Sequence, residues 1–414
     1  MIHSAINTDR LLSRFLSYVQ IDTTANPHAS EYPSSSGQLE LGRLLVQELL
    51  EMGLSDAVQD EHGLVWATVP ATVESAPTIL FNAHLDTSPE SPGANVRPRV
   101  VRDYQGGDIP LQHNGEVIRE SDCTALLNLL GHTLVITDGS TLLGGDDKAG
   151  VAAIMELAHY LVEHPEVPHG PVRVLFTCDE EVGHGALHMN LDRAAADAAY
   201  TLDGSGRAEV EAENFSADQI SIQAIGNNIH PSIGKGRMVN ALRGLAMLIA
   251  ELPLDSLSPE STEGMEGFLH PYSISGGVAK AKADILLRDF DTQKLDQYAQ
   301  LVAERADDVA GRIPGLRFEI NRQAQYRNMA DAIRKSPQVV DYALAAYRKM
   351  GLDPTEGKIR GGTDGAQFSA MGLPTPNLAV GQHNIHSVRE FVSVDEMVSA
   401  VQHAIELLVL WGKA

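Results

Sequence analysis

Thr141-Leu-Leu-Gly-Gly-Asp-Asp-Lys-Ala-Gly150 is the stretch of this 414-residue chain from which the fold can be argued. Two leucines lead into two glycines and two adjacent carboxylates, and from Ala149 apolar residues recur at helical spacing. An apolar run that turns into a helix at a pair of ionised aspartates can offer oxygen ligands to a divalent cation. Asp146 and Asp147 could equally be N-terminal caps that interact with the helix dipole. Other segments of the sequence are needed to distinguish a cation site from a helix cap.

Other strand-like runs also end in residues of the ligand type. They are His84 and Asp86 after 78–83, Glu180 and Glu181 after 170–177, Asp203 after 198–202, and His386 after 376–380. In open α/β sheets, ligands bind beyond the carboxyl ends of the strands, so such residues can meet there. Taken alone, each segment has an ordinary explanation: a polar loop, a solvated acidic loop or an Asp-Gly turn. Together with Asp146 they form the histidine and carboxylate set, without cysteine, of a hydrolytic zinc pair.

The pattern of polar and apolar residues changes near residue 217. Residues 218–225 alternate polar and apolar side chains, as in a sheet with one solvated face. A helix over 239–252, strands over 272–276 and 281–290, a helix over 292–310 and a strand over 316–320 are expected to follow. The order β-α-β-β-α-β is typical of a ferredoxin-like sandwich. We therefore expect an α/β catalytic domain of residues 1–212 and 324–414, with a mixed central sheet flanked by helices, and an inserted α+β lid domain of residues 213–323.

A local turn signal precedes the aspartate pair. Asp138-Gly139 separates an apolar strand at 133–137 from a second short apolar run at 141–143. The pattern predicts a β-hairpin whose second strand leads into the two glycines.

Composition limits the possible partners. The chain has 31 basic and 55 acidic residues and a formal charge of −24, which argues against binding to nucleic acid or to an anionic membrane. Its two cysteines, Cys123 and Cys178, have no CxxC spacing and fit a reducing compartment. The N-terminus lacks the pattern of a signal peptide, and no stretch approaches the length of a membrane span, so we expect a soluble cytoplasmic protein.

Eight segments carry a resemblance that extends along nearly the whole chain. They are HLDTSP (84–89), LLGGDDKAG (142–150), DEEVG (179–183), YTLDG (200–204), GNNIHP (226–231), LRDFD (287–291), RGGTDGAQ (360–367) and HNIHS (383–387). In this order they resemble the peptidase T family of tripeptide aminopeptidases, which are dizinc exopeptidases related to the glutamate carboxypeptidases. The resemblance implies a hydrolase that removes the N-terminal residue from short peptides.

The resemblance also implies roles for individual residues around two Zn²⁺ ions per subunit, which Co²⁺ or Mn²⁺ could replace. Asp146 would bridge the two ions, with His84 and Asp203 completing one site and Glu181 and His386 the other. Glu180 would be the general base. Asp86 would orient His84, a role that its place two residues further on also favours. The family's cis peptide bond would join Asp146 to Asp147.

Residues of the inserted domain, together with Arg360 of the catalytic domain, would act on the substrate. The resemblance implies that His230 stabilises the oxyanion and that Arg288, Arg360 and Asn240 bind the peptide's carboxylate end. The subunit would be a monomer or a homodimer formed through the inserted domain. His383 is a rival to His386, which we favour because its place in the segment matches the family's ligand.

Two alternatives remain open at this point. A related dizinc carboxypeptidase or amino-acid deacylase would share the same ligands and differ only in specificity. A catalytically inactive, peptide-binding relative would lack a ligand or the general base, and none of these residues is missing.

Overall fold

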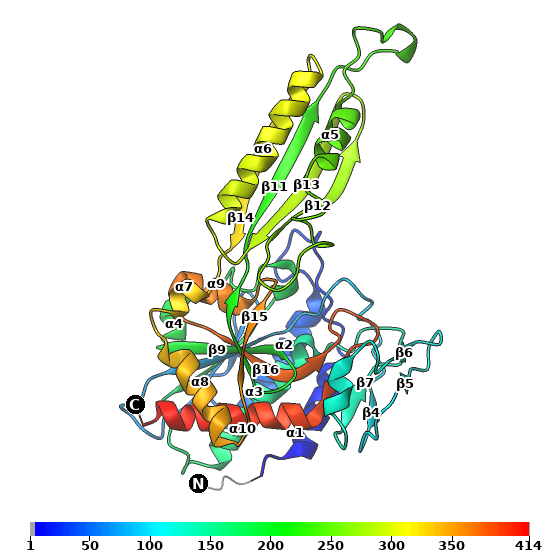
Figure 1. Ribbon diagram of the computed structural model, residues 1–414. Coiled ribbons are helices and arrows are strands. Elements are labelled where there is room, and N and C mark those ends of the chain that lie inside the picture. The colour runs from blue at the N-terminus through cyan, green and yellow to red at the C-terminus, as the bar shows by residue number, and fades with distance from the viewer. Residues whose placement is uncertain (1–4, 414) are drawn as a thin grey trace. The chain divides into compact units, whose positions relative to one another are not determined.

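The computed structural model describes residues 5–413, and these form two compact units (Figure 1). The first unit comprises residues 5–212, 329–358 and 363–413, and the second comprises Glu213–Asn328 and Ile359–Gly362. The second unit is thus an insertion in the chain of the first. Residues 324–328 and 359–362 were expected in the catalytic domain but belong to the second unit. The first of these segments does so because the last strand of that unit is longer than predicted.

An eleven-stranded sheet forms the centre of the first unit. Its main path is β1 (Val58–Gln59), β2 (Val65–Val69), β8 (Val172–Thr177), β3 (Ile79–His84), β9 (Ala198–Ser205), β16 (Asn377–His383), β17 (Phe391–Ser393), β7 (Leu134–Ile136) and β4 (Arg99–Val101). Off this path, β10 (Glu209–Asn214) pairs with β15 (Thr355–Ile359) and with β16. The pairs β8–β3, β3–β9 and β9–β16 are parallel and the other pairs along the main path are antiparallel, which confirms the expected mixed sheet.

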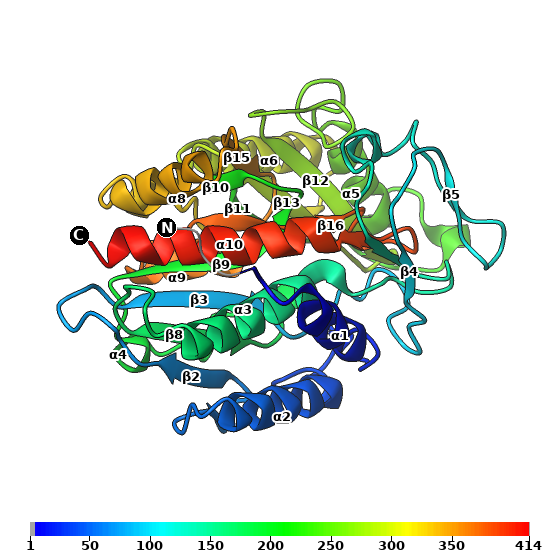
Figure 2. The same cartoon turned by 90° about the horizontal axis from the view of Figure 1, so that it is seen from below.

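Helices cover both faces of this sheet. They are α1 (Thr8–Tyr18), α2 (Ser36–Glu51), α3 (Gly145–Glu163), α4 (Leu191–Ala194), α7 (Ala330–Ile333), α8 (Gln338–Lys349), α9 (Asp364–Met371) and α10 (Val394–Trp411). Figure 2 shows α3 and α10 side by side, with α3 packed on β3 and β9 and α10 on β16. Residues of α4 and α9 pack with Trp66, Leu80 and Leu175 in a separate apolar cluster. Among the described residues, none of the helices combines the length and apolar character that a membrane crossing needs.

Helix α3 lies at the centre of the unit, and nearly every side chain from its first residue to Leu161 is buried. A glycine is needed at position 150 of this helix because a side chain would not fit there. A Cβ atom built on Gly150 would lie 2.0 Å from the carbonyl oxygen of Leu202, so glycine allows the helix to approach β9 this closely. The close contact places the N-terminal end of α3 beside the strand that carries Asp203.

The predicted hairpin at Asp138-Gly139 is wrong. Residues 138–143 form no strand, and β7 pairs with β4 and β17 instead. The amide of Leu142 donates to the Pro92 carbonyl, and the amide of Leu143 donates to the Glu390 carboxylate. Acceptors from distant segments therefore replace the ladder that the turn signal predicted. Smaller elements between β4 and β7 are β5 (Ile109–Pro110), β6 (Val117–Ile118) and the 3₁₀ helix Thr124–Asn128.

The second unit is a four-stranded antiparallel sheet with two helices on one face (Figure 1). Along the chain its elements are β11 (Ser216–Ile225), α5 (Ala241–Ala250), β12 (Phe268–Gly276), β13 (Lys280–Asp289), α6 (Lys294–Arg312) and β14 (Arg317–Tyr326). This is the predicted β-α-β-β-α-β order, with the sheet order β12-β13-β11-β14. Alternate residues of β11, such as Ile220 and Ile222, are buried against the helices. Strand β14 continues to Tyr326 because it pairs with β11 along its whole length.

Candidate metal centre

Three neighbouring parallel strands bring ligand-type side chains to one edge of the large sheet. His84 is the last residue of β3, Asp203 lies near the end of β9, and the Glu180–Glu181 pair follows β8. Because β3 lies between β8 and β9, the ends of all three strands are adjacent. The apolar runs thus deliver the polar residues that follow them to the same place, as expected for an open α/β sheet.

Asp146 lies between two imidazoles. Its Oδ1 atom is 3.0 Å from His84 Nε2, and its Oδ2 atom is 3.2 Å from His386 Nε2. His84 Nε2 is also 3.8 Å from Asp203 Oδ1, and His386 Nε2 is 3.0 Å from Glu181 Oε2. The five predicted ligands therefore come together as two groups that share Asp146. The peptide bond between Asp146 and Asp147 is cis, as the resemblance implied.

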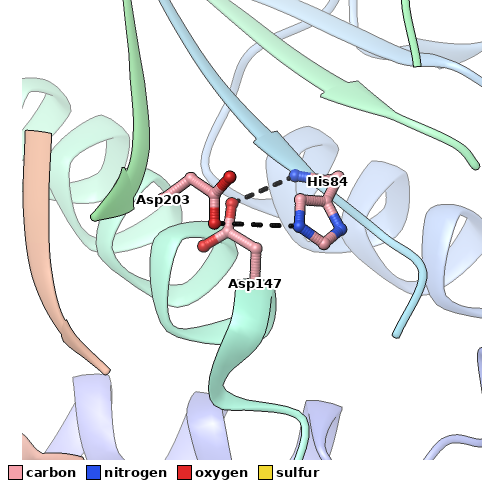
Figure 3. Close-up of side chains that lie close together, drawn as sticks. All are labelled: His84, Asp147 and Asp203. Atoms are coloured by element: carbon pink, nitrogen blue, oxygen red, sulfur yellow. Dashed lines mark hydrogen bonds and ion pairs between the residues drawn. The ribbon is translucent and has the colours of Figure 1, made fainter. Parts of the chain in front are cut away.

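Asp147 belongs to the same cluster, although the resemblance implied a ligand role only for its neighbour Asp146. Together with His84 and Asp203 it forms one of the groups that could hold a metal ion (Figure 3). Its Oδ2 accepts the backbone N–H of His84 at 3.2 Å, and its Oδ1 accepts that of Gly150 at 3.1 Å. Because both oxygens are engaged by amides, Asp147 holds the backbone of His84 in place. The adjacent pair of aspartates was the only signal for it.

The donor set fits a pair of cations. The cluster contains four carboxylates and two imidazoles, which is the ligand chemistry of zinc in hydrolytic sites. Glu181 Oε1 is buried and finds no hydrogen-bond partner among residues 5–413. A buried carboxylate oxygen without a donor is costly unless a cation or a proton satisfies it. The unpaired Glu181 oxygen adds to the case for a metal over a purely structural hydrogen-bond cluster.

Burial shifts the pKa values of several groups in this cluster. Burial raises the pKa of Glu181 to about 8 and that of Asp203 to about 6, and the Asp146 carboxylate acts in the same direction on both. Burial alone would lower the pKa of His386, but the carboxylates of Asp146 and Glu181 raise it to about 11. Burial also raises the pKa of Glu180 well above its ordinary value. Burial opposes ionisation of Asp146 as well, but hydrogen bonds from His386 and His84 hold its pKa below the ordinary value. Glu180, Glu181 and Asp203 therefore favour a proton or a nearby cation, whereas Asp146 stays ionised between the imidazoles.

Asp86 does more than the sequence indicated. Its side chain is fully buried and lies 3.4 Å from His84 Nδ1, while its backbone carbonyl is 3.1 Å from the same atom. In addition, Asp86 Oδ1 and Oδ2 accept the backbone amides of Glu180 and Glu181, each at 3.0 Å. One carboxylate thus positions a histidine and the two glutamates that follow the next strand.

The third acidic residue of the run points elsewhere. Asp179 is left-handed, with φ 60°, and its carboxylate accepts hydrogen bonds from the backbone and side chain of Ser34 and from Gln38 Nε2. Gln38 Oε1 in turn accepts the Asp179 amide at 3.0 Å. The N-terminal loop and α2 therefore hold the Asp179 carboxylate, which is not part of the groups around His84 and Asp146.

The geometry separates His383 from His386. His383 Nε2 lies 2.7 Å from Glu396 Oε2, and its ring stacks on Phe391. His386 is the one that faces Asp146 and Glu181. His383 is therefore held within the fold, and the structure brings His386 into the cluster.

The four residues predicted to act on the substrate, His230, Asn240, Arg288 and Arg360, belong to the second unit. Their roles stay predictions, but their local contacts differ. Asn240 caps α5 through the Arg243 amide, and Arg360 donates to the carbonyl oxygens of Gly264 and Glu266. By contrast, Arg288 Nε is buried and has no acceptor in the described part of the chain.

Residues 132–409 match the family model described as "Peptidase family M20/M25/M40". A peptidase T of Salmonella dublin is 45% identical over 407 residues, which cover 98% of this chain and 99% of the relative. A tripeptidase structure from Staphylococcus aureus has a TM-score of 0.77 at 24% identity and covers 99% of this chain and 100% of that one. A Bacillus subtilis structure, described as a dinuclear metal-binding peptidase of the M20 family, has a TM-score of 0.63 at 14% identity and covers 97% and 98%.

Proposed function

The chain belongs to peptidase family M20/M25/M40 and is an enzyme of the peptidase T type, and we propose that it removes the N-terminal residue from tripeptides with a pair of zinc ions. The proposed ligands are His84, Asp146, Glu181, Asp203 and His386. The single observation that carries the proposal is Asp146, whose two oxygens each face a different imidazole. A carboxylate in this position suits two cations at once.

When bound, two zinc ions supply Lewis acidity for the scissile carbonyl and for the water that attacks it. The protein's own side chains then handle the proton. Glu180 accepts the proton of the attacking water and returns it to the leaving amine, as a general base and then a general acid. Its place is fixed because Asp86 accepts its backbone amide and that of the neighbouring ligand Glu181.

Recognition of the substrate's carboxylate end falls to the second unit in this proposal. Arg288 is the strongest of the predicted residues because its buried Nε has no acceptor among residues 5–413. A guanidinium can bind a carboxylate through two parallel hydrogen bonds. His230 keeps its proposed role at the oxyanion. Assembly as a monomer or homodimer, replacement of zinc by cobalt or manganese, and the cytoplasmic location stay predictions.

The test compares a free tripeptide with its N-acetylated form. The proposal expects release of the N-terminal residue from the free peptide and no cleavage of the blocked one. Cleavage of the blocked peptide alone would instead identify a deacylase or a carboxypeptidase. Glu180→Ala should keep the zinc and lower kcat by about 10²- to 10⁴-fold, whereas Glu61→Ala, at an exposed glutamate, should behave as wild type. Normal turnover by Glu180→Ala would exclude Glu180 as the base.

A further inference from the structure

A β-hairpin near the C-terminus contributes more to the metal centre than His386. Strands β16 and β17 pair with His383 opposite Phe391, and residues 384–390 form the connection between them. The connection is well tied, because Ser91 Oγ donates to the His386 carbonyl and the Glu390 amide donates to Ser387 O. His386 and Glu390 therefore stand at fixed places on one loop.

Glu390 is buried, and its carboxylate faces the loop that carries Asp146. Its Oε2 accepts the backbone amides of Leu143 at 2.7 Å and Gly144 at 2.8 Å, and its Oε1 accepts the amide of Asp146 at 2.9 Å. The loop fits closely around this carboxylate, since a Cβ atom built on Gly145 would lie only 3.0 Å from Oε1. Three amides of one turn are thus satisfied by one distant side chain.

The same hairpin therefore holds Asp146 from two directions. His386 Nε2 faces the side chain at Oδ2, and Glu390 accepts the backbone amide of the same residue. We propose that Glu390 is a positioning residue, which sets the bridging carboxylate in the orientation that both cations share. This inference rests on the proposed zinc pair. It concerns a residue whose two carboxylate oxygens both accept backbone amides.

The expected size of the effect can be estimated because Glu390 accepts a hydrogen bond from Asp146, a proposed metal ligand. Residues that hydrogen-bond metal ligands typically change metal affinity or activity by about 10- to 100-fold when they are replaced. Asp146 is shared by both groups of ligands, so an error in its orientation affects both ions. A purely structural role would lower stability without a change in zinc affinity, which gives the two roles different signatures.

The test is Glu390→Gln, which keeps the size of the side chain but replaces one acceptor oxygen with a donor. Zinc affinity is measured by competition with a chromogenic chelator, and kcat and KM are measured on a tripeptide. We expect an affinity about 10- to 100-fold lower for at least one ion, and a lower kcat with little change in KM. Glu116→Gln is the matched control, because Glu116 pairs with Arg389 of the same loop at an exposed site. It should bind zinc as wild type does.

The outcomes are distinct. Wild-type zinc affinity in Glu390→Gln would overturn the positioning role. If Glu390→Gln does not fold, Glu390→Asp provides the test, because it keeps the charge but is one methylene too short to reach all three amides. Wild-type zinc affinity in Glu390→Asp would also overturn the inference. A wild-type protein that binds no zinc pair would refute the proposed function, and the inference with it. Two zinc ions in the wild type and equal affinity in the variant would refute the inference alone.

Discussion

Replacement of Asp86 by asparagine tests how the strand ends are joined into one site. The two oxygens of Asp86 each accept one amide, from Glu180 and Glu181, and both hydrogen bonds measure 3.0 Å. In Asp86→Asn one oxygen remains, and the new NH₂ group faces a backbone N–H that no longer has an acceptor. The side chain is fully buried, so water cannot replace the lost acceptor.

The expected loss can be estimated from this geometry. A buried donor left without an acceptor costs about 1 to 3 kcal/mol, so the free energy of unfolding should fall by about that amount. The two amides belong to the proposed general base, Glu180, and to the proposed ligand Glu181. Loss of their acceptor should therefore also lower kcat, by about 10- to 100-fold. In the metal-free protein, removal of one negative charge from an acidic cluster offsets part of the loss. Stability is therefore best compared at a fixed excess of zinc.

Urea unfolding and tripeptide hydrolysis provide the measurements. Asp108→Asn is the matched control, because Asp108 also accepts a backbone amide, that of Glu120 at 3.0 Å, but its side chain is 49% exposed. Its substitution should change the unfolding free energy by less than about 1 kcal/mol, because water can satisfy the amide. If Asp86→Asn unfolds and turns over as the control does, the idea that Asp86 fixes the two glutamates is wrong.

Two further predictions concern the support of the fold. Glu156 is fully buried between two arginines of α1, so Glu156→Gln should lower the free energy of unfolding in urea by about 3 to 5 kcal/mol. Glu163 is a half-exposed partner of the same Arg10, so Glu163→Gln should lower it by less than about 1 kcal/mol. Equal effects of the two substitutions would contradict the account. Burial lowers the pKa of His403 to about 4, against about 6.5 in the unfolded chain, so its contribution to stability is complete above pH 6.5 and is lost as the pH falls towards 4. The full loss is about 3 kcal/mol. His403→Phe cannot titrate, so its free energy of unfolding, measured in urea at each pH, should fall less between pH 6.5 and pH 4 than that of the wild type. An equal fall with pH in both proteins would rule out this pKa shift.

Local patterns located two of the strand ends that carry candidate ligands. An apolar run followed by a histidine or carboxylate predicts a strand with a functional residue at its end, and His84 and Asp203 lie in such places in the structure. The alternation along 218–225 was equally informative, because one face of β11 is buried under helices. These signals depend on neighbours in sequence, so a single sequence contains them.

Residues that act at long range could not be assigned in this way. Glu390 is 244 positions from the amide of Asp146 that it accepts, and Asp147 is 63 positions from His84. The hairpin at Asp138-Gly139 failed for the same reason, because the amide of Leu143 donates to that distant glutamate instead of to a neighbouring strand. An acidic residue whose acceptors serve a far segment looks like any other acidic residue in the sequence.

The most direct test of the central claim is the zinc content of the purified protein and of Asp146→Asn after dialysis against buffered zinc. The account predicts two zinc ions per chain in the wild type and in the Asp108→Asn control, and fewer than two in Asp146→Asn, because the side chain shared by both groups of ligands is altered. A wild-type protein with no zinc, or an Asp146→Asn protein that still binds two ions with wild-type affinity, would contradict it.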